Sequence, residues 1–184
     1  MTTLTQPQSI EKFLQAPETE PATEFLNGVT SQKPMPQGEH SLIQGAFCET
    51  LNQVLKPQKI ALALPELRCT FGGSSIVPDI AVFRWDRIPR TASGRIINRF
   101  ETHPDWAIEI LSPNQSLTKV LGKLLHCIQN GTKLGWIIDP TEDAILAVFE
   151  NQRVQLFQGN DTLPILKNIP LTLTVEQVFS WLVL

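Results

Sequence analysis

The stretch Pro104-Asp105-Trp106-Ala107-Ile108-Glu109-Ile110-Leu111-Ser112-Pro113 predicts a short buried strand that carries one carboxylate, Glu109. Because side chains alternate between the two faces of a strand, one face holds Trp106, Ile108 and Ile110, and the other holds Ala107, Glu109 and Leu111. An ionised carboxylate in apolar surroundings is costly unless a cation or hydrogen bonds compensate it. Glu109 therefore indicates either a metal-binding site or a buried salt bridge.

A second acidic strand precedes this one by about thirty residues and carries Asp79 within residues 76–83. If the two strands pair, the carboxylates of Asp79 and Glu109 project towards a shared point. Mg²⁺ takes about six oxygen ligands and usually keeps several waters. Two carboxylates, a backbone carbonyl and waters would satisfy it, so the two strands predict a divalent-metal site.

The composition favours one soluble, compact domain. The chain has 184 residues, of which 42% are hydrophobic and 18% are charged, and this is enough to bury a core. We expect a mobile tail over residues 1–20 and a single domain over residues 21–184. No apolar run reaches the length of a membrane span, and three scattered cysteines suit a reducing compartment, so we expect a cytoplasmic protein. The net charge of −3 argues against a non-specific nucleic-acid coat.

Hydrophobic periodicity and turn residues predict a mixture of helices and strands around an apolar sheet. Residues 24–28 resemble the close of a helical turn. Helices are expected over residues 39–55, 114–130 and 174–184, and strands over residues 29–32, 59–64, 67–71, 76–83, 106–111, 134–138, 144–150 and 153–158. The predicted fold class is therefore α/β (α+β), with a central mixed sheet flanked by helices.

Lys123 is the candidate for a catalytic lysine. Its helix begins just after the Glu109 strand, and Lys123 lies near the edge of the apolar stripe formed by Leu117, Leu121, Leu124, Leu125 and Ile128. A lysine there would stabilise the negative charge of a phosphoryl transition state. Spacing alone also fits an ordinary surface lysine.

Residues 84–103 form the most basic segment, with five arginines against two acids. Such a segment fits phosphate contact, a solvated loop or a subunit contact. Other chemistries have no motif here. The chain lacks GxSxG, GxxxxGK[ST] and HExxH, and its three histidines are too separated to suggest a metal cluster.

Four segments in order carry a family resemblance. They resemble the Uma-type group of restriction-endonuclease-like proteins, within the PD-(D/E)XK nuclease superfamily. The matching positions are residues 78–82, residues 104–113, Lys123 and residues 130–140. The resemblance covers roughly residues 22–160. It implies a restriction-endonuclease-like fold, a Mg²⁺-dependent nuclease site in which Mn²⁺ is the alternative ion, and a homodimer.

The resemblance also implies roles for individual residues. Asp79 matches the first metal ligand, Glu109 the second, and the backbone carbonyl of Ile110 a third oxygen. Lys123 matches a lysine that has moved to the following helix, and Glu24 matches an acidic position in an N-terminal helix that helps bind metal or water.

Three further positions bear on the resemblance. His40 matches a histidine that often opens the next helix of the family. Leu111 stands where most of the superfamily has its lysine, and Cys127 stands where the family usually has a tyrosine. The chain contains no tyrosine at all.

Three hypotheses follow. The leading one is a Mg²⁺-dependent endonuclease that hydrolyses DNA phosphodiester bonds. The alternative is a catalytically inactive nuclease-fold protein that binds nucleic acid or a protein partner through residues 84–99. The third is a structural domain whose acids are paired internally.

Overall fold

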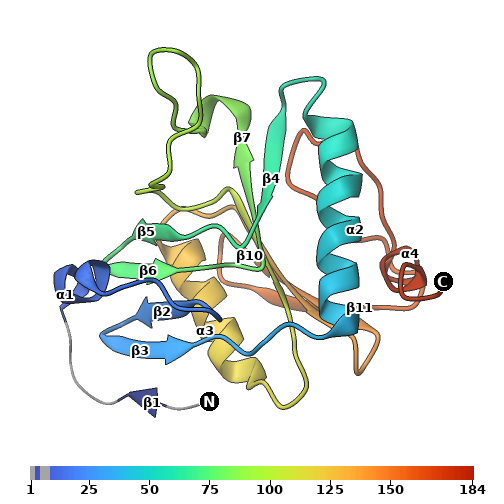
Figure 1. Ribbon diagram of the computed structural model, residues 1–184. Coiled ribbons are helices and arrows are strands. Elements are labelled where there is room, and N and C mark those ends of the chain that lie inside the picture. The colour runs from blue at the N-terminus through green and yellow to red at the C-terminus, as the bar shows by residue number, and fades with distance from the viewer. Residues whose placement is uncertain (1–2, 5–8) are drawn as a thin grey trace.

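The computed structural model describes residues 3–4 and 9–184, which form two sheets and the helices around them (Figure 1). The strands of the larger sheet are β4 (Ala61–Pro65), β7 (Ile80–Arg84), β8 (Trp106–Ile110), β9 (Leu134–Asp139), β10 (Ala144–Phe149) and β11 (Val154–Gln158). The helices are α1 (Ile10–Gln15), α2 (Gly38–Leu55), α3 (Leu117–Gln129) and α4 (Val175–Ser180), with a 3₁₀ turn at Trp85–Arg87.

The larger sheet has the order β11-β10-β9-β8-β7-β4 and is mixed. Strands β8 and β9 run parallel, while the other neighbouring pairs described in this sheet are antiparallel. Parallel strands need a crossover connection, and α3 supplies it between β8 and β9. Ile80 pairs with Ile108, so Asp79, which directly precedes β7, comes beside Glu109.

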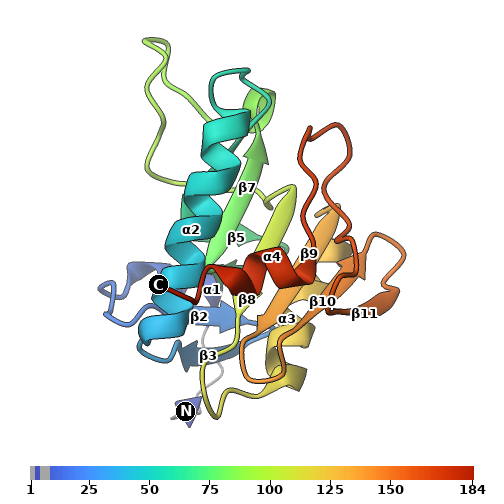
Figure 2. The same cartoon turned by 90° about the vertical axis from the view of Figure 1, so that its right-hand side faces the viewer.

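Helices cover both faces of this sheet. On one face α2 and α4 lie side by side (Figure 2), and the Phe47 ring packs 5.7 Å from Trp106 and 5.5 Å from Trp136. On the other face, Ala107 packs in one cluster with Leu124 and Cys127 of α3. The alternation predicted for the Glu109 strand is therefore confirmed, as is the fold class of a mixed sheet flanked by helices.

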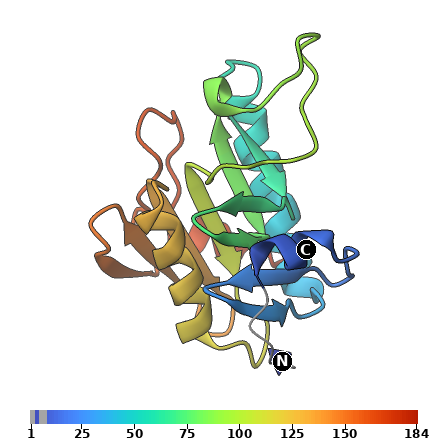
Figure 3. The same cartoon turned by 90° about the vertical axis from the view of Figure 1, so that its left-hand side faces the viewer.

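The smaller sheet lies beside α3 on the face opposite α2 (Figure 3). It contains β1 (Thr3–Leu4), β2 (Thr23–Leu26), β3 (Val29–Gln32), β5 (Cys69–Phe71) and β6 (Ser74–Ile76), in the order β1-β3-β2-β6-β5. The prediction of a helical turn around Glu24 is wrong, because Glu24 lies on strand β2. Asn27 and Gly28 both have positive φ, 51° and 81°, which suits the tight turn of a hairpin rather than a helix end.

The strand predicted over residues 76–83 begins later than expected and leaves out Asp79, and Ile76 belongs to a different strand in the smaller sheet. β6 ends at Ile76 and β7 begins at Ile80, with Val77, Pro78 and Asp79 between them. Pro78 has no N–H to donate to a ladder, so it ends the first strand. The break places Asp79 where the two sheets meet.

The buried face of α3 also differs from the predicted stripe. Leu117 is 40% exposed, whereas Val120, Lys123, Leu124, Cys127 and Ile128 are buried. The buried face of α3 is thus shifted around the helix from the predicted stripe and includes Lys123. The interpretation of Lys123 as a surface lysine is wrong. A lysine enters this face because carboxylates compensate its charge.

The middle of the basic segment, residues 84–103, projects from the fold as a long loop (Figure 1), while Ile88 and Phe100 of the same segment are buried in the core. Three of its arginines contact neighbouring groups. Arg84 donates to the main-chain carbonyl of Lys167 over 2.7 Å, Arg87 Nη1 lies 2.8 Å from Asp105 Oδ1, and the Arg90 guanidinium lies over the Trp85 ring. Arg95 and Arg99 are exposed.

The predicted division into a tail and one domain stays a prediction, since residues 1–2 and 5–8 lie outside the described part of the chain. Within the expected tail, α1 packs Phe13 against Phe25 of β2 with ring centroids 5.5 Å apart. None of the helices described here has the length and apolar character to cross a membrane.

Candidate active site

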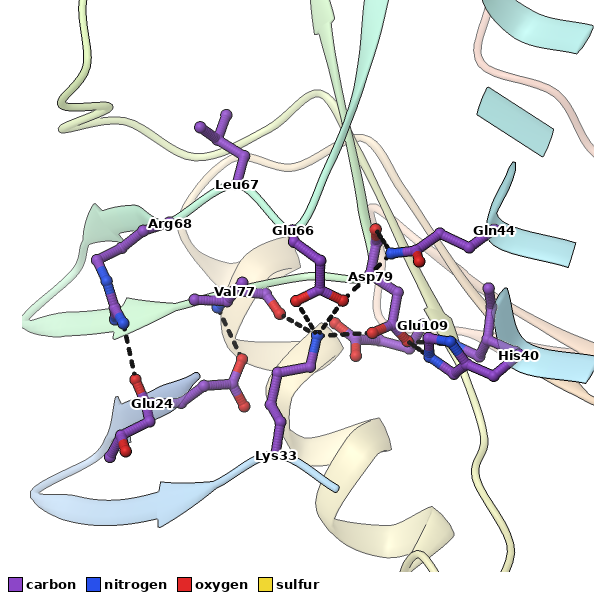
Figure 4. Close-up of polar contacts among 12 residues, drawn as sticks. Glu24, Lys33, His40, Gln44, Glu66, Leu67, Arg68, Val77, Asp79 and Glu109 are labelled. Atoms are coloured by element: carbon purple, nitrogen blue, oxygen red, sulfur yellow. Dashed lines mark hydrogen bonds and ion pairs between the residues drawn. The ribbon is translucent and has the colours of Figure 1, made fainter. Parts of the chain in front are cut away.

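Asp79 is held by three separate parts of the chain (Figure 4). The N–H of Ile110 on β8 donates to Oδ2 over 2.6 Å, and His40 Nε2 lies 3.2 Å from the same oxygen. Lys33 Nζ lies 2.6 Å from Oδ1. One turn after His40 on α2, Gln44 donates to the main-chain carbonyl of Asp79 over 2.8 Å. Both the side chain and the main chain of Asp79 are therefore fixed.

These contacts keep Asp79 charged. Burial alone would raise the pKa of this carboxyl, but the Lys33 ammonium and the His40 hydrogen bond outweigh burial and hold the pKa well below its usual range. Burial would likewise lower the pKa of Lys33, but the Asp79 carboxylate outweighs it and the pKa is raised. Asp79 and Lys33 thus form a buried ion pair at neutral pH.

Glu109 lies on the opposite face of β8 from Trp106 and points towards α3. Its Oε2 lies 2.8 Å from Lys123 Nζ. Its Oε1 is buried and has no hydrogen-bond partner among the described residues. Burial raises the pKa of Glu109 above its usual value, and the Lys123 ammonium opposes this shift. Leaving a buried oxygen without a partner is costly, and a proton, a water or a metal ion would satisfy it.

Lys123 is clamped between two carboxylates from different sheets. Its Nζ lies 2.8 Å from Glu109 on β8 and 2.9 Å from Glu24 Oε1 on β2. The same Glu24 oxygen accepts the N–H of Val77 over 2.7 Å. Burial alone would lower the pKa of Lys123, but Glu109, Glu24 and Asp79 outweigh it and raise the pKa. Lys123 is therefore a permanently charged link between the two sheets.

Lys33 is a site residue that the sequence alone does not reveal. This lysine follows β3 directly and precedes Pro34-Met35-Pro36, and nothing in its spacing separates it from a surface lysine. In the structure its side chain is 8% exposed and contacts Asp79, which lies 46 residues further along the chain. The only local signal is its place between a strand and a proline-rich connection.

Two cavities open onto this cluster. One, of about 440 Å³, is lined among others by Lys33, His40, Glu66, Asp79, Ile110 and Ser112. The other, of about 300 Å³, is lined by Glu24, Lys119 and Lys123. Gln115 lines both. The predicted site residues therefore lie together but are reached from two sides.

The donor set fits a hard divalent cation. This fit does not rest on a cluster of side chains, because within residues 3–4 and 9–184 no three His, Cys, Asp or Glu side chains are arranged to hold a metal. An ion here would rest on the carboxylates of Asp79 and Glu109, with the main chain at Ile110 and waters completing its shell. The unpartnered Glu109 oxygen supports this fit, since a cation would satisfy it.

The two positions that depart from the family pattern are apolar in the structure. Leu111 is partly buried against the cluster formed with α3, and Cys127 is a free, buried thiol whose pKa burial raises well above its usual value. On this side of the sheet, the charged side chains in contact with one another are Glu109, Lys123 and Glu24.

Comparisons with known proteins show the family of this chain. A protein from Anabaena variabilis, whose crystal structure is described as that of "a putative nuclease belonging to DUF820", is 49% identical to this chain. The match covers 96% of this chain and 100% of that one, with a TM-score of 0.94. No curated protein matches the chain. The model of the Uma2 family, described as "Putative restriction endonuclease", matches residues 10–176. This chain therefore belongs to the Uma2 family.

Proposed function

We propose that this protein is a Mg²⁺-dependent endonuclease that hydrolyses DNA phosphodiester bonds, with Mn²⁺ as the alternative ion. The observation that carries the proposal is the strand register that sets Asp79 beside Glu109. The buried Oε1 of Glu109 has no partner among the described residues, and its Oε2 contacts the buried Lys123. Membership of a family of restriction-endonuclease-like proteins supports nuclease chemistry.

Asp79 and Glu109, with the carbonyl of Ile110, would hold the ion. Mg²⁺ bound in such a site lowers the pKa of a water and stabilises charge on a phosphoryl oxygen. Asp79 suits this role because its charge is maintained and its position is fixed from β8 and α2. Glu109 suits it because one carboxylate oxygen is held by Lys123 while the other is free to bind.

Lys123 and Glu24 would act together. Lys123 supplies a charged ammonium beside Glu109, where negative charge accumulates during attack on a phosphate. Glu24 orients that ammonium, and its hydrogen bond from Val77 ties it to the connection that carries Asp79. DNA as the substrate, a homodimer and a cytoplasmic location are expectations from the sequence and the family resemblance, and they belong to this proposal.

The test is cleavage of supercoiled DNA in Mg²⁺ or Mn²⁺, with EDTA as the metal-free control. Asp79→Asn and Glu109→Gln keep the side-chain shape and remove the charge, so both should abolish nicking while circular dichroism reports an intact fold. Asp143→Asn, an exposed turn residue, is the matched control and should cleave as wild type does.

Undiminished cleavage by Asp79→Asn and Glu109→Gln would contradict the proposal. Salt-sensitive DNA binding without cleavage, retained in both variants, would instead favour the inactive nucleic-acid-binding alternative.

A further inference from the structure

The ammonium of Lys33 lies in a cage of oxygen atoms. Asp79 Oδ1 lies 2.6 Å from Nζ, Val77 O 2.9 Å, and the two oxygens of Glu66 3.0 Å and 3.1 Å. An ammonium has three protons to donate, and carboxylates and a carbonyl are its natural acceptors. The same oxygens are the ligands that a hard divalent cation prefers. Figure 4 shows all of these contacts converging on the one nitrogen.

A divalent ion would have to compete with this ammonium for Asp79, because both oxygens of the carboxylate are already engaged. Oδ2 accepts the Ile110 N–H and lies 3.2 Å from His40 Nε2, and Oδ1 lies 2.6 Å from Lys33 Nζ. Two cations placed within about 3 Å of one carboxylate oxygen would repel each other strongly in a buried site. Lys33 already experiences the positive charge of Lys123, which opposes its own charged form. A second ion on Asp79 would therefore require Lys33 to leave.

Lys33 has room to leave without a change of fold. Its side chain forms part of the wall of the 440 Å³ cavity, together with Asp79 and Glu66. A lysine side chain has four methylene groups and rotates freely when released. Glu66, whose side chain is 43% exposed, already contacts Lys33 and can remain its partner when the contact with Asp79 is broken.

We propose that Lys33 is a built-in cation that occupies the metal-binding carboxylate of the resting protein, so that a divalent ion binds Asp79 only when Lys33 withdraws into the cavity. This inference rests on the metal site of the proposed function and adds a competing residue to it. When metal is scarce, Lys33 compensates the negative charge of Asp79. When metal binds, the contacts between Lys33 and Asp79 must be broken, so the free energy of metal binding is less favourable by the free energy of those contacts.

The first test is calorimetric titration with Mn²⁺ and with Ca²⁺ of the wild type, Lys33→Met and Lys133→Met. Lys133 is the matched control, because it is 49% exposed and its loss changes the net charge equally. Lys33→Met should bind the ion with a dissociation constant lower by about tenfold or more, the change expected when a competing interaction worth about 1.4 kcal/mol is removed. Lys133→Met should bind as wild type does.

The second test uses the wild type, so it does not depend on the folding of Lys33→Met. The protein is acylated with an N-hydroxysuccinimide ester, with and without saturating Ca²⁺, and the modified lysines are identified by mass spectrometry. Lys33 should be protected without Ca²⁺ and labelled several-fold faster with it, while Lys123, clamped by Glu24 and Glu109, stays protected in both.

The outcomes separate the inference from the proposed function. If the wild type binds the ion and Lys33→Met is folded but binds no more tightly, or if Lys33 stays protected while the ion is bound, the competition by Lys33 is wrong and the metal site stands. If Asp79→Asn binds the ion as tightly as wild type, or no form of the protein binds it, the metal site itself is wrong and the inference falls with it.

Discussion

The Glu24 carboxylate and the Lys123 ammonium lie 2.9 Å apart, although 99 residues separate them along the chain. Glu24 belongs to β2 of the smaller sheet, and Lys123 belongs to α3, which packs on the larger one. Their side chains are 10% and 6% exposed. This pair fastens the smaller sheet over the Glu109 side of the site, so structural integrity and the proposed chemistry depend on the same ion pair.

Removing Glu24 should strongly destabilise the protein. Glu24→Ala leaves Lys123 with one carboxylate fewer in a buried place, and breaking such a pair typically costs about 3–5 kcal/mol. Urea unfolding followed by fluorescence measures the change in the free energy of unfolding. Glu150→Ala is the control, because its pair with Lys133 spans 3.7 Å between exposed side chains and is worth about 0–1 kcal/mol. Equal destabilisation in the two variants would show that the buried pair contributes no more to the free energy of unfolding than the exposed pair does.

Replacing Lys123 should lower the rate of DNA cleavage. Lys123→Met removes the ammonium beside Glu109, and removal of one group that stabilises transition-state charge costs about 10²–10³ in kcat. The exposed Lys167→Met is the control. Steady-state cleavage of a labelled duplex separates kcat from KM, and a change in KM alone would assign Lys123 to substrate binding instead. Thermal unfolding of the variant shows whether the lower rate reflects an unfolded protein.

The basic segment should contact phosphates if it takes part in DNA binding. The double variant Arg95→Gln and Arg99→Gln removes two exposed guanidiniums, so binding should weaken. The slope of log K against log salt should fall by about 0.9 for each phosphate that the segment no longer neutralises. Fluorescence anisotropy over a salt series measures both. Arg153→Gln, an exposed residue just before β11, is the control. An unchanged slope in the double variant would remove this segment from the DNA interface.

The cysteines should be unreactive in the folded protein. Burial raises the pKa of Cys48 to about 11 and that of Cys69 to about 12, and the pKa of Cys127 is also raised well above its usual value. The reactive thiolate forms only as pH rises towards the pKa, so at pH 8 about one Cys48 in a thousand is ionised. Iodoacetamide should therefore label none of the thiols appreciably at pH 8, and all three in denaturant. As the pH is raised, Cys48 should be the first to react, because it is only half-buried. Fast labelling of Cys127 at pH 8 would contradict the burial of that thiol.

Much of the fold follows from local pattern. The apolar run around Glu109 becomes β8, the strand predicted over residues 29–32 is β3, and the helices at α2 and α3 begin and end within a few residues of expectation. These elements are predictable because hydrophobic periodicity and turn residues act over short distances. The break after Ile76 and the hairpin at Asn27-Gly28 are harder to predict, since Pro78 and positive φ values compete with a plausible continuous pattern.

In the candidate site, too, some residues can be predicted from the sequence and others cannot. Asp79 and Glu109 are recognisable from the sequence alone, because each is a single acid within an apolar stretch. The partners that keep them buried are not recognisable from spacing. Lys33 and Glu24 stand in ordinary-looking segments, and Lys123 has the spacing of a surface residue.

Tertiary packing is what brings these charges together. Lys33 reaches Asp79 across 46 residues and Lys123 reaches Glu24 across 99. The physical reason is that periodicity records which side chains leave water, whereas charge compensation depends on which segments meet after folding. Local sequence pattern therefore defines most of the strands and the two acids, and the packing of two sheets against α3 selects the cations that those acids hold.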